Sequence, residues 1–288
     1  GVRPTAARDA GQGQAGSDGK CPVMPEIISQ PTNQTATVGQ TTSFSVTAAG
    51  TAPLSYQWSL NSTNINGATN TTLTLGNVQL SDAGSYSVTV SSPYGVATSS
   101  NAVLRVNQPP VADATATTPL VISTNNSNAT VVLNGSLSFD PDGDSLQYFW
   151  HWTGEPDPLA TGIIAAVVLP VGTNAITLEV NDGLISTEHT ITVEVITPAQ
   201  AVARLEALVK VDVSKNQDLI ASLNAALASI NCRNLTAAGN QLRAFQNKVR
   251  AQISPLDAVL AQTLINDAQN IINAITGFHG SKASAINV

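Results

Sequence analysis

The chain has 288 residues, of which only 11% are charged, and this length suits about two or three domains. Its net charge is −7, its pI is about 4.8, and its 12 Lys and Arg residues form no cluster. Nucleic acids and anionic membrane surfaces select basic patches, which this chain lacks. No stretch reaches the roughly 20 apolar residues of a membrane helix. We therefore expect no nucleic-acid partner and no membrane insertion.

The low charge predicts a location outside the cell. Thr, Asn, Ser, Ala and Val take the place of the roughly 25% charged residues in an average soluble protein, which is typical of secreted and surface-displayed chains. The chain starts at Gly1 with no signal peptide before it. We interpret it as a processed mature chain or an excised fragment, extracellular or on the cell surface, whose signal peptide has been removed. Residues 1–24, rich in Gly, Ala and Gln, predict an extended tail.

Residues 25–106 alternate between apolar and polar side chains with period two, which predicts β-strands. We expect strands at 42–48, 54–60, 73–75, 86–90 and 96–106. The polar stretch at 61–70 indicates a turn region.

Trp58 and the motif Asp82-x-Gly84-x-Tyr86 are the residues of this region that indicate a family. A lone Trp on a β-rich run, followed by Asp-x-Gly-x-Tyr about two dozen residues later, resembles an immunoglobulin domain. The resemblance implies a buried Trp and a Tyr that forms a corner. The two cysteines of the family are missing, and Val46 and Val88 stand at their positions. The resemblance thus implies a cysteine-free bacterial variant held together by apolar packing, and such domains are spacers and binders, seldom catalysts.

A second β unit is predicted at 107–196. It opens on the stiff linker 107–110, where neither Pro109 nor Pro110 can continue a hydrogen-bonded ladder. Its landmark segments are Val131–Ser136, Ser138–Asp144, Tyr148–Trp150, Leu169–Thr173 and Leu178–Gly183. Together these segments resemble a PKD repeat, another β-sandwich. The sequence departs from that family at 151–154, where His-Trp-Thr-Gly replaces an acidic motif.

From Pro198 onward the apolar period changes from two to 3.6, which predicts helices. The apolar stripes are Leu219, Leu223, Leu227 and Ile230; Leu242, Phe245 and Val249; and Leu256, Leu260, Leu264, Ile271 and Ile275. Helix starts are indicated at Thr197–Pro198, Ser214, Thr236 and Ser254–Asp257, and a stop at Gly277. We expect about four helices in a small bundle over 197–277, followed by a C-terminal tail at 278–288.

Three segments of this helical region resemble the FIMAH module, which ends many secreted bacterial proteins; they are Ala225–Leu227, Asn240–Phe245 and Ala268–Ile272. The predicted fold class is therefore multidomain. Two all-β sandwiches, the first immunoglobulin-like and the second PKD-like, precede a small all-α helical bundle.

The acidic loop Asp140-x-Asp142-x-Asp144 is the best candidate site. Three carboxylates at spacing two repel one another unless a cation or solvent intervenes, and Ca²⁺ prefers six to eight such oxygens. The resemblance to calcium-binding PKD repeats adds Asp182 as a fourth candidate ligand. The alternative is an Asx-turn, in which the carboxylates accept hydrogen bonds from nearby backbone N–H groups.

The two cysteines, Cys21 and Cys232, leave three interpretations open. An exported chain favours a disulfide, either within one chain or between chains. A bond from Cys21 of one subunit to Cys232 of the next would be heterologous and would propagate a fibre. Two unrelated free thiols are the third interpretation.

Aromatic residues gather at 148–152. Alternation places Tyr148, Trp150 and Trp152 on one face of a strand and Phe149 and His151 on the other. Such a row is usually core, with Trp150 as the central packing residue. The alternative is a glycan contact through Trp150 and Trp152, since exposed aromatic rings stack on sugar rings.

No familiar catalytic motif is present, so we do not expect an enzyme. The predicted function is an extracellular structural and interaction protein: a surface, matrix or fibre component. Its expected partners are further copies of itself or other surface and matrix proteins. The alternative is a non-catalytic, polysaccharide-binding or spacer portion of a secreted hydrolase or adhesin.

Overall fold

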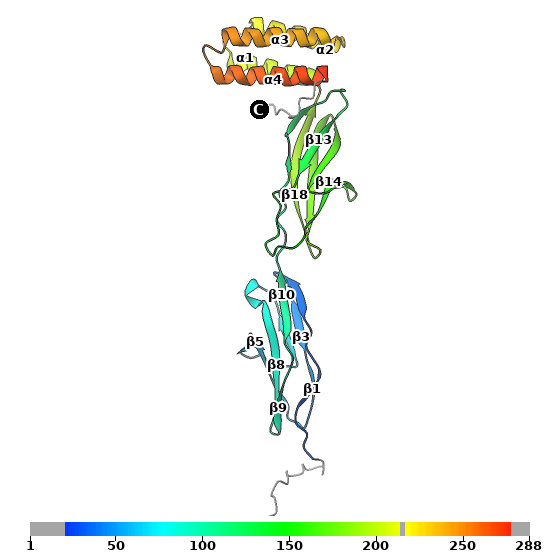
Figure 1. The fold of residues 1–288 in the computed structure, drawn as a ribbon, viewed down its shortest axis with the longest axis vertical. Helices are drawn as coiled ribbons and strands as arrows, with labels where there is room; N and C mark the ends of the chain where they lie inside the picture. The colour runs from blue at the N-terminus through cyan, green and yellow to red at the C-terminus, as the bar shows by residue number, and fades with distance from the viewer. Residues whose placement is uncertain (1–20, 214–216, 278–288) are drawn as a thin grey trace, which may run out of the picture. The chain divides into compact units, whose positions relative to one another are not determined.

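The structure is a computed structural model that describes residues 21–213 and 217–277 (Figure 1). Its contacts divide the chain into two compact units, Gly1–Pro109 and Pro110–Val288. The predicted fold class is confirmed, because β-sandwiches are followed by four helices. Most of the predicted tail at 1–24, all of the predicted tail at 278–288 and the predicted N-cap Ser214 lie outside the described residues.

The first unit is an all-β sandwich. Its main sheet has the strand order β2-β10-β8-β5-β6, with β9 beside β8, while β3 pairs with β7 and β1 with β4. The strands are β1 (Glu26–Ser29), β2 (Gln34–Thr37), β3 (Thr42–Ser45), β4 (Thr47–Ala49), β5 (Ser55–Leu60), β6 (Thr63–Asn64), β7 (Thr72–Leu75), β8 (Gly84–Ser92), β9 (Gly95–Thr98) and β10 (Ala102–Asn107).

Trp58 is the centre of this core, as the sequence predicts. It is 0% exposed, and its Nε1 donates to the backbone oxygen of Asn70 at 2.8 Å. Val46 and Val88 are both buried in the same apolar cluster. Apolar contacts therefore fill the positions at which the immunoglobulin resemblance leads one to expect cysteines.

Tyr86 forms the predicted corner. Its hydroxyl donates to the backbone oxygen of Asp82 at 2.7 Å, and its ring stacks on Phe44 with a centroid distance of 4.6 Å. Burial, and secondarily the charge of Asp82, raises the pKa of Tyr86 to about 12. The hydroxyl therefore stays a hydrogen-bond donor throughout the physiological pH range.

The predicted strand at 96–106 is wrong in one respect, because it is two strands, β9 and β10. Ser99 lies between them and is buried. Its N–H donates to the Val88 oxygen at 2.9 Å, and its Oγ accepts from the Val88 N–H at 3.0 Å. A side-chain oxygen thus replaces the backbone acceptor that a continuous ladder requires. The predicted strand at 42–48 is also two strands, β3 and β4, which pair with different partners, β7 and β1.

The second unit starts with another sandwich of two sheets. Their strand orders are β11-β13-β16 and β12-β18-β17-β14-β15 (Figure 1). The strands are β11 (Thr115–Ala116), β12 (Leu120–Ile122), β13 (Asn128–Asn134), β14 (Gln147–Trp152), β15 (Pro158–Thr161), β16 (Ile164–Pro170), β17 (Gly172–Asn181) and β18 (Ser186–Ile196). Trp150 on β14 is 0% exposed, and its Nε1 donates to the Gly162 oxygen at 3.0 Å.

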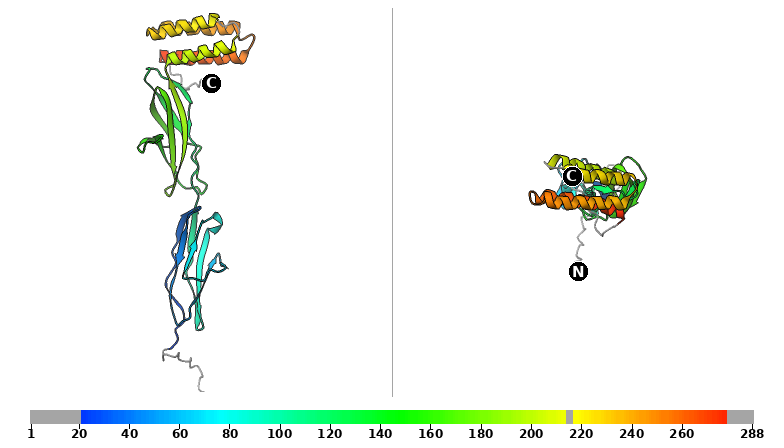
Figure 2. Two further views of the ribbon diagram at one scale, coloured as in Figure 1. Left: turned by 180° about the vertical axis from the view of Figure 1, so that it is seen from behind. Right: turned by 90° about the horizontal axis from the view of Figure 1, so that it is seen from above.

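Four helices complete the second unit: α1 (Pro198–Asp212), α2 (Gln217–Asn231), α3 (Leu235–Gln252) and α4 (Ala258–Thr276). Contacts join α1 to α2 and α4, and α3 to α2 and α4, and α2 and α3 lie alongside each other in Figure 2. The bundle is therefore a closed ring of four neighbours around one core.

The helix ends follow the sequence signals in part. Thr197 caps α1, with Pro198 at its first turn, and Gly277 ends α4 with φ of 67°. The predicted N-cap Thr236 is wrong, because the Asn234 side chain accepts from the Ala237 N–H and α3 begins before Thr236. Leu256, assigned to an apolar stripe, precedes α4 and is 85% exposed.

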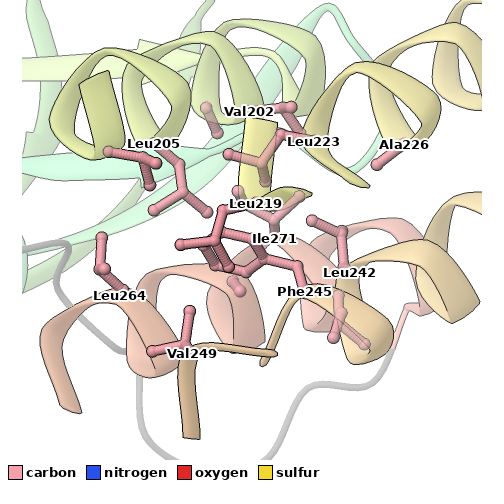
Figure 3. Close-up of a cluster of buried hydrophobic side chains, with 14 of the residues drawn as sticks. Val202, Leu205, Leu219, Leu223, Ala226, Leu242, Phe245, Val249, Leu264 and Ile271 are labelled. Carbon is pink, nitrogen blue, oxygen red and sulfur yellow. The ribbon is translucent and has the colours of Figure 1, made fainter. Parts of the chain in front are cut away.

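The bundle core also reaches the neighbouring sandwich. Its central side chains include Leu205, Leu223 and Phe245 (Figure 3). Leu120 on β12 and Ile196 at the end of β18 belong to the same buried cluster. The predicted boundary at 196–197 therefore falls inside one continuous core.

The corner hydrogen bond gives a first prediction. Tyr86→Phe should lower the free energy of unfolding of the first unit by about 1 kcal/mol, because the Asp82 carbonyl loses its donor. Urea unfolding followed by tryptophan fluorescence measures the change. Tyr94→Phe is the matched control, since Tyr94 is 42% exposed and should change little. Equal effects of the two variants would contradict the prediction.

Asp267 on α4 gives a second prediction. Its carboxyl is 2% exposed, and within the described part of the chain its Oδ2 has no hydrogen-bond partner. Burial raises the pKa of Asp267 from 3.8 to about 6. A raised acid pKa means that the folded state holds the proton more tightly, so stability declines as the pH rises from about 4 to 6.

Asp267→Asn should therefore stabilise the second unit at neutral pH, by at most about 3 kcal/mol. The difference in free energy of unfolding between Asp267→Asn and the wild type should vanish near pH ~4, where the wild-type carboxyl is already neutral. Urea unfolding across this pH range checks the difference between the two proteins. Asp157→Asn, at an exposed residue, controls for loss of a charge alone. A stability difference between wild type and Asp267→Asn that does not vary with pH would rule out the buried carboxylate as its cause.

Candidate functional site

The acidic loop lies before β14, and the structure brings its three carboxyl groups together. Ligand atoms of Asp140, Asp142 and Asp144 all lie within 4.8 Å of one another. Gly143, with φ of 79°, adopts a left-handed conformation that side chains disfavour. The backbone therefore turns back on itself and makes the three side chains converge.

The Asx-turn interpretation of this loop is confirmed for Asp140. Asp140 Oδ1 accepts from the N–H of Asp142 at 2.7 Å and from that of Asp144 at 3.1 Å. Asp140 Oδ2 is shielded from solvent and has no hydrogen-bond partner among the described residues. One oxygen thus builds the turn, while the other remains for a further ligand.

Asp182, the fourth candidate, does not belong to this convergent group within the described residues. It lies in the turn between β17 and β18, where its Oδ1 accepts from the N–H groups of Leu184 and Ile185, both at 2.7 Å. The structure therefore assigns Asp182 a turn-forming role in its own hairpin.

The aromatic row is divided as alternation predicts. Trp150 lies in the core, and Tyr148 and Trp152 pack partly against it. The alternative that Trp150 contacts a glycan is wrong, because Trp150 is 0% exposed. Trp152 is partly exposed and lines a cavity.

This cavity, of about 390 Å³, lies on the outward side of β14, β17 and β18. His151 faces Thr177 across the β14–β17 ladder, and Glu179 faces Glu188 across the β17–β18 ladder. The His151 side chain is 13% exposed, and its Nε2 lies 3.4 Å from Glu179 Oε2. Neither ring nitrogen makes a hydrogen bond to a described residue.

Sequence reasoning missed the two glutamates, although a partial signal was available. The turn residues Asp182 and Gly183 predict a hairpin, but a two-residue turn there would pair Glu179 with Ser186. The loop has four residues, 182–185, and this register pairs Glu179 with Glu188. In this register two like charges lie opposite each other on one face of the sheet, which is unfavourable and typical of a binding role.

Cys21 and Cys232 are exposed free thiols in this structure. The predicted intrachain disulfide is therefore not formed in it. Both thiols are open to solvent, which leaves the bond between chains as a prediction.

The comparisons with known proteins identify the first sandwich. A family model described as an immunoglobulin domain matches residues 24–92, so this part is immunoglobulin-like. A search of curated proteins found no match. Among the helices that the structure describes, none has both the length and the apolarity needed to span a membrane.

Similar solved structures include parts of titin and of Sidekick-1. An I-band fragment of titin, I67–I69, is 18% identical with a TM-score of 0.44, and the match covers 60% of this chain and 66% of that one. Sidekick-1 immunoglobulin domains 1–5 are 16% identical with a TM-score of 0.41, covering 60% and 39%. Titin M4 is 22% identical with a TM-score of 0.29, covering 30% and 99%.

Proposed function

We propose that this chain is an extracellular structural and interaction protein of bacterial type, a surface, matrix or fibre component that associates with further copies of itself. Its second sandwich is PKD-like and its bundle FIMAH-like in this proposal, and the chain is not an enzyme. The observation that carries the proposal is the outer face of the β11–β13–β16 sheet. That face is apolar and ends in an edge strand.

Three side chains make up the apolar part of this face. Val132 on β13 and Ile164 and Val168 on β16 are 40%, 63% and 56% exposed. Neither strand contains a charged residue, whereas natural edge strands usually carry charges that block pairing with another chain. In a chain of net charge −7, an uncharged face is a place where two copies meet without repulsion.

A second copy fits this edge by symmetry. β16 ends its sheet in the described part of the chain and pairs there with β13. Two copies of β16 related by a two-fold axis form an antiparallel pair, in which each strand supplies the same groups to the other. The exposed Cys21 and Cys232 would add a second, head-to-tail contact if they join between chains.

Val168→Lys should weaken self-association at least about tenfold, because the two-fold axis brings the introduced charges close together. Sedimentation velocity over a range of concentrations measures this. Val96→Lys, at a 65% exposed valine of the first unit, is the matched control and should associate like the wild type.

Reductant separates the two contacts. A ladder of covalent multimers that collapses on reduction would support the bond between Cys21 and Cys232 of neighbouring chains. A chain that is monomeric at every concentration, with and without reductant, would refute self-association. Equal loss in Val168→Lys and Val96→Lys would refute the β16 edge as its site.

We also propose that the acidic loop binds Ca²⁺. Support comes from the convergence of Asp140, Asp142 and Asp144 and from the buried, unpartnered Oδ2 of Asp140. Asp182 joins the site in this proposal only if its side chain leaves its own turn. The ion would offset the repulsion among the carboxylates and stiffen the loop before β14.

Calcium should then raise the free energy of unfolding of the second unit by about 2.7 kcal/mol at a hundredfold excess over its dissociation constant. Thermal unfolding in Ca²⁺ and in chelator measures the shift. Asp142→Asn should abolish it, Asp157→Asn should retain it, and Asp182→Asn decides whether the fourth residue contributes. Identical unfolding in Ca²⁺ and in chelator would leave the loop as an Asx-turn alone.

One observation favours a second function, polysaccharide binding. Pro156, Thr177, Glu179 and Glu188 line the cavity, which is also bordered by Trp152 at the end of β14. An apolar wall with a few polar groups is the usual composition of a small-molecule site. This function is compatible with self-association, because the cavity lies on the sheet that contains β14, not on the sheet that contains β16.

A further inference from the structure

The charged residues that line the cavity beside Trp152 restrict the class of ligand that it can bind. Its ionisable lining residues are His151, Glu155, Glu179 and Glu188, with no Lys or Arg among them. Glu179 and Glu188 face each other directly across two strands, an arrangement that destabilises a sheet unless a cation offsets it. The cavity therefore favours a positively charged ligand.

Glu179 is held in place for such a ligand. Its Oε1 accepts from the Ser186 hydroxyl at 2.6 Å, and that hydroxyl in turn accepts from Asn181 Nδ2 at 2.7 Å. Its Oε2 lies 3.4 Å from His151 Nε2. One carboxylate oxygen is thus fixed by the hairpin, and the other lies beside the imidazole.

A metal ion suits this cavity poorly. Within the described residues, only the side chains of the acidic loop form a group of three whose ligand atoms converge within 4.8 Å. In the cavity, His151 Nε2 and Glu179 Oε2 lie 3.4 Å apart, but no third carboxylate or imidazole of the described residues converges with them that closely. The volume of about 390 Å³ lies in the range of small organic ligands.

The uncharged lining residues of the cavity indicate the chemistry of the ligand beyond its positive charge. The hydroxyls of Thr153 and Thr177 lie 2.9 Å apart, and those of Thr177 and Thr190 lie 2.8 Å apart. This row of hydroxyls crosses three strands and can exchange hydrogen bonds with a polyol. Pro156 provides an apolar contact for a ring, whereas Trp152, which also borders the cavity, packs partly against the core.

We propose that the cavity binds an amino sugar, a pyranose unit that carries a free, protonated amine. Glu179 and Glu188 bind the ammonium group by charge-assisted hydrogen bonds. The threonine row and the nitrogens of His151 bind the ring hydroxyls, and Pro156 contacts the ring. The proposal rests on the polysaccharide-binding function and adds the chemical class of the sugar.

Isothermal titration of the full chain with short oligomers tests this, at a pH where the sugar amine is protonated. A glucosamine oligomer should bind at least about tenfold more tightly than the N-acetylglucosamine oligomer of equal length, because acetylation removes the charge. Added salt should weaken binding of the glucosamine oligomer and leave binding of the acetylated one unchanged.

Variants locate the site. Glu188→Gln and Glu179→Gln should each raise the dissociation constant for the glucosamine oligomer about tenfold, and Pro156→Ala should raise it for both oligomers. Glu26→Gln, on β1 of the first unit, is the matched control and should bind like the wild type. Glu188 is exposed, so its variant remains informative if Glu179→Gln misfolds, which circular dichroism would reveal.

The outcomes are distinguishable. Equal binding of acetylated and free-amine oligomers would overturn the amino-sugar proposal and leave polysaccharide binding intact. No binding of either oligomer, or of a neutral glucose oligomer, would overturn both. A lysine peptide that binds as tightly as the glucosamine oligomer would indicate a protein partner instead of a glycan. Unchanged binding in Glu188→Gln, with the fold intact, would place the site elsewhere.

Discussion

A fully buried tryptophan that must keep its indole N–H hydrogen-bonded organises each sandwich. An unpaired buried donor costs about 1–3 kcal/mol, and both domains meet that need in the same way. Trp58 donates to the Asn70 oxygen and Trp150 to the Gly162 oxygen, in each case 12 residues further along the chain. The loop after the tryptophan strand is thereby fixed to the core. In the first sandwich Val46 and Val88 complete the packing without a covalent bond between the sheets.

The same constraint determines what the outer face displays. Because side chains alternate along a strand, burying Trp150 forces His151 outward. The strand pairing then places Thr177 and Thr190 directly beside His151 across the sheet. Glu179 and Glu188, two residues along their strands, form the neighbouring pair on the same face. A shift of β14 by one residue in its pairing register would exchange the two faces of the strand. Trp150 would then leave the core, and His151 would leave the cavity. The cavity residues are thus positioned by packing on the opposite side of the sheet.

The sequence predicts the features that depend on local pattern. The four helices and the convergence of Asp140, Asp142 and Asp144 follow from period and spacing, whereas the buried Trp58 and the Tyr86 corner follow from the resemblance to an immunoglobulin domain. The division of the last immunoglobulin-like strand does not, because it depends on Ser99 meeting Val88 across a ladder. The capping of α3 by Asn234 instead of Thr236 could not be predicted either, because both residue types are good N-caps. The cavity could not be predicted from local pattern, because it depends on the register in which β17 pairs with β18.

The helices add a constraint that the two sandwiches alone would lack. Ile196 ends β18, and Thr197 begins the capping of α1, so strand and helix are joined without a flexible linker. Ile196 and Leu120 are buried among helix side chains, and Glu194 on β18 pairs with Arg204 on α1. Pulling the bundle away from the sandwich would therefore expose apolar surface and break an ion pair. This junction thus couples the bundle directly to the second sandwich.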